Sequence, residues 1–162
     1  MLSVRKATEN DLARIMEIYR NAQEFMIRSG NPDQWGHTYP QPELIASDIQ
    51  LGACHVIYDE QDIHGVFALF EGEDPTYKQI YDGKWLNDDV YIAVHRVAGD
   101  GKVHGILRRL LEHCEGICSN IRIDTHQKNL VMQERLKRNG FVPCGIIYLE
   151  NGAARIAFQR AM

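Results

Sequence analysis

Residues 100–111, DGKVHGILRRLL, combine residue types suited to binding an anion. Two glycines and a lysine follow a strand-like run and precede a helical one. A helix N-terminus presents unpaired backbone N–H groups and about half a positive charge, so a pyrophosphate binds there without a dedicated side chain. Gly105 would let the backbone approach such a ligand, while Lys102 and Arg108 add positive charge. The alternative is a polar strand-to-helix turn that binds nothing.

Alternating and helical patterns along the chain predict the elements that position this segment. The helix after the segment is amphipathic, with Leu110, Leu111 and Cys114 on one side. Asn151-Gly152 is a strong hairpin signal near the C-terminus. The predicted order is strand 2–6, a helix from residue 12, a second helical patch at 25–27, a loop at 31–40, helix 42–51, strands 53–58 and 63–71, an irregular segment 74–89, strand 90–98, helix 105–116, strand 121–125, helix 129–139, and strands 141–149 and 154–159.

This order predicts the sheet. A strand, a helix and a strand in succession require a parallel pair, whereas the two hairpins require antiparallel pairs. We therefore expect an α+β (mixed α/β) fold in one domain over residues 1–162, with a central mixed, twisted sheet of about seven strands and helices on both faces.

Composition excludes several classes of function. Eighteen Lys plus Arg against 22 Asp plus Glu give a net charge of −4 without a basic block, so nucleic acid is not expected as a partner. No apolar run reaches the roughly 20 residues that span a bilayer, and the N-terminus lacks an apolar signal core, so we expect no membrane contact and a cytoplasmic location. The four cysteines form no CxxC pair, which predicts reduced thiols and no metal site.

The central motif resembles that of the GCN5-related N-acetyltransferases, the GNAT family. Its pattern of Gln or Arg, two residues, Gly, one residue, and Gly or Ala falls on Lys102, Gly105 and Leu107, at the start of the helix after the fourth strand. Lys102 keeps a donor, whereas Leu107 is bulky where the family has a small residue. Downstream, Asn129 and the pair Gly140-Phe141 match the family's Asn, helix and Gly-Phe ending.

The resemblance implies a GNAT-like acyl-CoA N-acyltransferase fold, with acetyl-CoA as co-substrate and a small-molecule or peptide amine as acceptor. Asn129 is also a good helix N-cap, and one side chain can serve both roles. Trp35 and Tyr39 fall where the family builds the acceptor side of its cleft, although core packing would explain them equally. The residues implied to contact the cofactor are Val97, Ala98, Lys102, Val103, His104, Gly105, Ile106, Leu107, Arg108 and Asn129.

The residues that handle protons depart from the family pattern. The family commonly places a Tyr acid seven residues after the Asn, and that position is Leu136 here. His95 is the candidate base, since it shares a strand face with Tyr91 and an unperturbed imidazole titrates near pH 6.5. Tyr148 is the candidate acid. For both His95 and Tyr148, simple packing is the competing interpretation.

The predicted function is direct transfer of acetyl from acetyl-CoA to an amine. A second hypothesis is an acyl-CoA-binding or regulatory module of the same fold, favoured by Leu107 and Leu136. A flavodoxin-like or nucleotide-binding domain is the third, and the antiparallel hairpins argue against it. The acceptor and the oligomeric state stay open, with a homodimer as one expectation.

Overall fold

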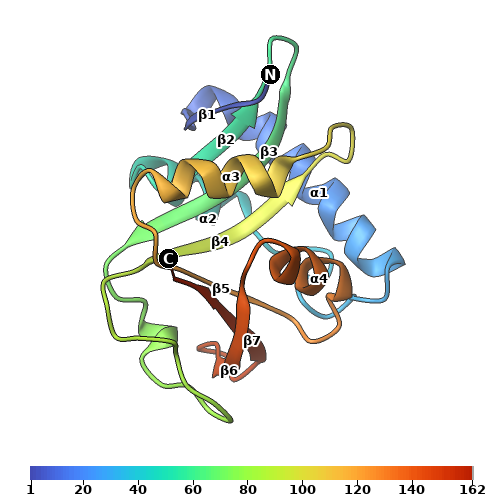
Figure 1. Cartoon of the computed structure of the whole chain (residues 1–162). Coiled ribbons are helices and arrows are strands. Elements are labelled where there is room, and N and C mark those ends of the chain that lie inside the picture. Colours follow the sequence, from blue (N-terminus) through green and yellow to red (C-terminus); the bar gives the residue numbers. More distant parts are fainter. Residues whose placement is uncertain (162) are drawn as a thin grey trace.

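The computed structural model describes residues 1–161, and its centre is a mixed seven-stranded sheet (Figure 1). The strands stand in the order β1-β2-β3-β4-β5-β7-β6. Only β4 and β5 run parallel, and every other neighbouring pair is antiparallel. The strands are β1 (Ser3–Lys6), β2 (Cys54–Tyr58), β3 (Ile63–Glu71), β4 (Ile92–Gly99), β5 (Ile121–Thr125), β6 (Val142–Tyr148) and β7 (Ala154–Arg160). The predicted mixed sheet is confirmed.

Helices cover both faces of the sheet. They are α1 (Leu12–Arg28), α2 (Pro42–Gln50), α3 (Ile106–Glu115) and α4 (Leu130–Arg138). Figure 1 shows α3 crossing one face, with α1 and α2 behind the sheet. On the α1 face, buried Ile15, Ile18 and Ile45 pack on Val56 and Val66 of the strands.

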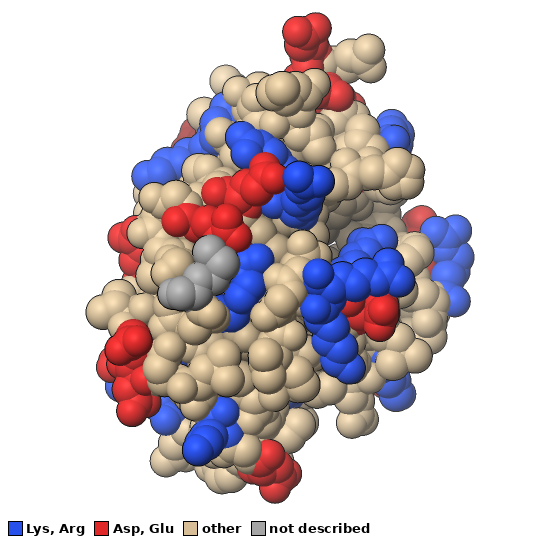
Figure 2. All heavy atoms as spheres, viewed as in Figure 1, with Lys and Arg blue, Asp and Glu red and all other residues tan. Residues whose placement is uncertain are grey.

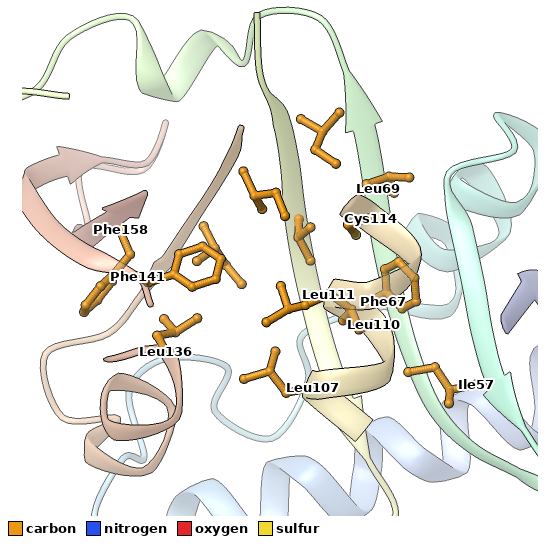
Figure 3. Close-up of a cluster of buried hydrophobic side chains, with 14 residues drawn as sticks. Ile57, Phe67, Leu69, Leu107, Leu110, Leu111, Cys114, Leu136, Phe141 and Phe158 are labelled. Carbon is orange, nitrogen blue, oxygen red and sulfur yellow. The ribbon is translucent and has the colours of Figure 1, made fainter. Parts of the chain in front are cut away.

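The larger core lies between α3, α4 and the other face of the sheet (Figure 3). In Figure 3, Leu110 of α3 lies beside Phe67 of β3, whereas Leu107 lies on the side of α3 that faces Leu136. Leu136 of α4, fully buried, belongs to the same cluster. Because burying an apolar side chain contributes roughly 1.5–3 kcal/mol, this amphipathic packing holds the N-terminus of α3 in place beside β4.

The helical patch predicted separately at residues 25–27 is part of α1, which runs unbroken for 17 residues. No Gly or Pro interrupts the chain between Tyr19 and Phe25, and Gln23 faces inward at 6% exposure and donates to the Tyr39 carbonyl oxygen. The separate helix was therefore a wrong division of one element. The predicted hairpins between β2 and β3 and between β6 and β7 are confirmed.

Candidate functional site

The loop between β4 and α3 has a fixed shape because the Asp100 side chain, fully buried, holds it from three sides. One carboxylate oxygen accepts from Arg14 of α1 at 2.9 Å and lies 2.7 Å from His64 Nδ1 of β3. The other accepts from the Lys102 backbone N–H at 2.9 Å. The loop that sequence analysis singled out is therefore tied to the sheet and to α1 at its first residue.

The same loop leaves a row of backbone donors free. Within residues 1–161, no backbone N–H from Val103 to Arg108 donates a hydrogen bond to another residue. Gly105 is the N-cap of α3 with φ +86°, a left-handed conformation that favours glycine, and a Cβ there would meet no atom within 4 Å. Free N–H groups at a helix N-terminus form an anion-binding site.

The side chains around these backbone donors divide into exposed and buried ones. Lys102, His104 and Arg108 are exposed, whereas the Leu107 side chain lies in the core. Leu107 therefore offers a ligand only its backbone N–H, and its bulk does not fill the loop. Figure 2 shows Lys and Arg side chains on both sides of a hollow between the α3 N-terminus and α4.

Next to the loop, β4 and β5 separate. Their pairing covers Ile92–Ile121, Ala93–Arg122 and Val94–Ile123 and then stops, although both strands continue. The register of β4 against β3 shifts between Val66 and Ala68, so Arg96 and Val97 together face one residue of β3. Such a bulge bends a strand and interrupts its pairing. The two parallel strands therefore diverge beside the loop that leads into α3.

Arg96 is held in the unusual conformation that this bulge requires. Its φ is +53°, which is uncommon for a residue with a side chain. The Arg96 guanidinium donates to both carboxylate oxygens of Asp48 at 2.9 and 3.0 Å, and Tyr19 Oη donates to the Arg96 carbonyl oxygen at 2.7 Å. Helices α1 and α2 thus maintain the opening between β4 and β5.

A cleft of about 270 Å³ occupies the opening. Five residues predicted for the site line it, namely Trp35, Tyr39, His95, Val97 and Asn129. Other lining residues come from α1, the loop after it, β5, α4 and β7, namely Met26, Gln34, Asp124, Thr125, Met132 and Arg155. Ala98, 5% exposed, belongs to the α1-side core and does not line the cleft.

His95 is part of a hydrogen-bonded group at the cleft. Its Nε2 lies 2.6 Å from Asp74 Oδ2, and its Nδ1 lies 3.8 Å from Asp124 Oδ2. Tyr77 Oη donates to the same Asp124 oxygen at 2.7 Å. Asp74 also accepts from Thr76 N and Oγ1 at 2.9 and 2.7 Å. The side chain of His95 is 21% exposed, so it is neither a core residue nor a free surface group.

The state of Asp74 decides which nitrogen of His95 carries hydrogen. Burial alone would raise the pKa of Asp74, but hydrogen bonds from His95 and Thr76 outweigh it and lower the pKa to about 2. Near neutral pH Asp74 is therefore a carboxylate, which can only accept. In the neutral form of the imidazole, His95 Nε2 therefore carries the hydrogen and Nδ1, on the Asp124 side, presents a lone pair.

Asn129 caps α4, as predicted: its side-chain oxygen accepts from the Met132 backbone N–H at 3.1 Å. Its amide nitrogen donates to Gln34 Oε1 at 3.1 Å. Gln34 Oε1 also lies 3.4 Å from Thr125 Oγ1 at the end of β5. These contacts join the loop after α1 to the C-terminal side of the cleft.

Of the predicted aromatic site residues, two line the cleft and one lies at the β6 edge of the sheet. Trp35 is 9% exposed and packs edge-on against Tyr19 at 5.6 Å, so it serves the core as well as the cleft wall. Tyr39 is 39% exposed, and its hydroxyl lies 3.3 Å from Arg96 Nη1. Tyr148 does not line the cleft; it is 48% exposed and packs against Tyr81 at the β6 edge. The structure thus does not bring the predicted acid to His95.

Sequence reasoning missed Asp74, Asp124 and Arg155. Asp124 had a signal, because it is a charged residue inside the short apolar strand IRIDT. Asp74 resembles an ordinary turn cap, because its side chain accepts from Thr76 N and it precedes Pro75. Arg155 stands in an alternating strand, where an arginine is usually solvent-exposed.

The chain is similar to solved structures over nearly its whole length. An acetyltransferase of the GNAT family from Streptococcus agalactiae is 30% identical, with a TM-score of 0.89 over 99% of this chain and 95% of that one. The fold is shared by a ribosomal-protein-alanine N-acetyltransferase from Brucella melitensis, at 17% identity and TM-score 0.63 over 99% of each chain. It is also shared by yncA from Salmonella typhimurium, solved with its cofactor acetyl-CoA, at 14% identity and TM-score 0.61 over 99% and 93%.

No family model and no curated protein matches this sequence. Among the helices of residues 1–161, none has both the length and the apolar character needed to cross a bilayer.

Proposed function

We propose that this chain, which belongs to the GNAT family of acetyltransferases, transfers the acetyl group of acetyl-CoA directly to a primary amine. One observation carries the proposal: a row of free N–H groups follows the same strand, β4, whose His95 faces a cleft. An anion-binding site and a proton acceptor are thereby joined by a few residues of backbone. A cytoplasmic location is part of the proposal.

The residues present fit coenzyme A. The free N–H groups of residues 103–108 would hold its pyrophosphate, with Lys102, His104 and Arg108 adding charge at the rim. The pantetheine arm would pass between β4 and β5 at the point where the two strands are no longer paired with each other. Val97 and Asn129 lie beside this opening. The yncA structure, which contains acetyl-CoA, supports this use of the fold.

Acetyl-CoA supplies an activated thioester, so a C–N bond to the amine forms as the C–S bond breaks. An amine arrives protonated and must lose a proton before it can attack. His95 Nδ1 accepts that proton, because Asp74 holds the hydrogen on Nε2. Asp124, 3.8 Å from Nδ1, would attract the incoming ammonium and stabilise the imidazolium that forms. His95 can then return its proton to the departing sulfur, while the nitrogen loses its second proton to solvent as the amide forms, so that the products are the amide, the thiol of CoA and one solvated proton.

A binding module without efficient catalysis is the second candidate. The observation in its favour is that Leu136, at the position where the family commonly has its Tyr acid, is fully buried in the core. The proposed return of the proton from His95 removes the need for that acid. The two candidates differ in one measurable property, turnover.

The test is thiol release from acetyl-CoA with a panel of primary amines, run beside calorimetry with CoA. The proposed function requires CoA binding and amine-dependent thiol release. Binding without release for every amine would instead support the binding module. Absence of binding would contradict both.

A further inference from the structure

Arg155 is a buried arginine on the wall of the cleft. It is 8% exposed and lies on β7, where it pairs with Ile147 of β6. Its neighbour two residues on, Ala157, pairs with Asp124 of β5. Alternate residues of a strand share a face, so Arg155 and Asp124 project to the same side of the sheet as diagonal neighbours.

The guanidinium of Arg155 has spare donors. It donates to the Ala154 carbonyl oxygen at 2.9 Å and to the Gln34 carbonyl oxygen at 3.2 Å. A guanidinium has five N–H donors, so three remain without a protein acceptor within residues 1–161. Nor does any carboxylate of those residues lie within 4.0 Å of it.

Other well-covered arginines of this protein are compensated. Arg14 pairs with Asp100 at 2.9 Å, Arg96 pairs with Asp48 at 2.8 Å, and Arg160 pairs with Glu115. Arg122 has no carboxylate but lies between aromatic rings, with Trp85 at 4.1 Å and Tyr91 at 3.9 Å. Among residues 1–161, Arg155 has neither a carboxylate within 4.0 Å nor an aromatic ring as a partner.

An uncompensated buried charge is costly. Burial lowers the pKa of Arg155, with only a partial opposing effect from Asp124. A group of this kind on the wall of an open cleft gains most when a ligand brings the missing anion. A carboxylate is the planar anion that a guanidinium binds with two parallel hydrogen bonds.

We propose that Arg155 binds a carboxylate of the acceptor, so that the acceptor is an amine with a carboxylate close to its amino group, as in a free α-amino acid. The inference rests on the proposed function, which places the amine at His95 and Asp124. Because Arg155 and Asp124 are diagonal neighbours, about 7–8 Å apart along the sheet, amine and carboxylate must be near each other in the ligand. The N-terminus of a protein lacks that carboxylate and is excluded as the main acceptor.

The rest of the cleft favours an uncharged amino-acid side chain. Besides the charged groups, its wall includes Met26, Trp35, Tyr39 and Leu149. These side chains are apolar or aromatic and can cover a side chain of similar character.

The experiment compares acceptors that differ only in the carboxylate. L-alanine, L-leucine, L-methionine and L-phenylalanine are each tested beside their C-terminal amides, and kcat/KM is measured by thiol release. A charged hydrogen-bonded site should favour the acid over the amide by about 10- to 100-fold. The amide has the less basic amine, so easier deprotonation cannot produce this preference.

Arg155→Gln should lower kcat/KM for the acids by about 10- to 100-fold and lower that for the amides much less, so that the preference for the acids is lost. Arg155→Lys should restore part of the preference. The matched control is Arg20→Gln, an exposed arginine on α1 outside the cleft. Arg155→Gln loses the hydrogen bonds to the Ala154 and Gln34 carbonyl oxygens but also removes a costly buried charge, so the melting temperature should change little. A structural role would lower it and would reduce activity with acid and amide alike.

Two results would overturn the inference. If the wild-type protein acetylates the amides as efficiently as the acids, the proposed function stands and the carboxylate site does not. If no amine is acetylated, the proposed function fails. Whether Arg155 binds a carboxylate is then measured by calorimetry, in which N-acetyl-L-leucine and its amide are titrated into the CoA-loaded protein. Tighter binding of the acid that depends on Arg155 supports the site, and equal binding contradicts it.

Discussion

At the scale of single residues, the pair His95–Asp74 controls where a proton can go. His95→Gln keeps an amide N–H that can donate to Asp74 but removes the basic nitrogen. We predict a fall in turnover of about 100-fold, the lower end for a positioned acid or base. CoA affinity by calorimetry and the melting temperature should stay near wild type, because the hydrogen bond to Asp74 at 2.6 Å can be kept. Unchanged turnover would mean that water removes the proton without His95.

Asp74 makes a pH-dependent contribution to stability. Its pKa of about 2 in the folded protein lies below the ordinary value of 3.8, so folding favours its ionised form. The contribution is fully present above about pH 4 and is lost as the pH falls toward 2. Because the Asp74 side chain is partly exposed, we expect no more than about 2 kcal/mol.

Urea unfolding of the wild type and Asp74→Asn between pH 5 and pH 2 measures this contribution. The wild type should be the more stable at pH 5, and the difference should shrink toward pH 2. Asp88→Asn, an exposed aspartate in the same irregular segment, is the control and should show little change at any pH. If the difference in unfolding free energy between the wild type and Asp74→Asn stays constant with pH, the effect of the substitution does not come from ionisation of Asp74.

At the scale of elements, the N-terminus of α3 depends on a left-handed glycine. Gly105→Val adds a branched side chain at φ +86° in front of the free N–H groups. We predict a fall in CoA affinity of tenfold or more, about 1.4 kcal/mol, in calorimetry. Gly72→Val is the matched control, since it also has φ +86° with no atom within 4 Å of a Cβ and lies outside the loop. Equal CoA affinity in the two variants would place the anion site elsewhere.

The N-cap of α4 separates two roles of one side chain. Asn129→Ala removes the hydrogen bond to the Met132 N–H, and loss of an N-cap costs about 1 kcal/mol. The melting temperature should fall by about 2–4 °C, as that energy implies for a protein of this size. Calorimetry with CoA on the same variant tests the cofactor role. If the variant is less stable but binds CoA with unchanged affinity, Asn129 caps α4 and does not contact the cofactor.

At the scale of the whole molecule, the cleft exists because two helices and a β-bulge keep two parallel strands apart. A ligand that binds across β4, β5 and α3 should stabilise all three together. At a CoA concentration 100 times the dissociation constant, folding should gain about 2.7 kcal/mol, seen as a higher melting temperature. The same addition to Gly105→Val should produce a smaller increase, and an equal increase would contradict binding at the loop.

Much of this arrangement was predictable from local patterns. Each strand and helix lies within a few residues of its predicted range, because apolar periodicity, caps and the Asn151-Gly152 turn act over short distances. The exception is α1, which was predicted as two separate helical segments. The apolar periodicity is weaker in the middle of this helix, but no residue there ends it. The Gly105 loop was visible for the same reason, since a left-handed N-cap depends on one residue and its neighbours.

The cleft itself depends on residues distant in sequence. Asp74 reaches His95 across 21 positions, Arg96 needs Asp48 across 48, and Arg155 meets Gln34 across 121. No periodicity records such pairs, because they form only when the sheet brings separate segments together. Tyr148 was the predicted acid because it ends the strand after Gly140-Phe141, yet the sheet order places it at the β6 edge, away from His95. The sequence by itself determined the elements and the Gly105 turn, whereas the tertiary structure decided which charged groups share the cleft, because burial and pairing of charges are properties of the assembled sheet.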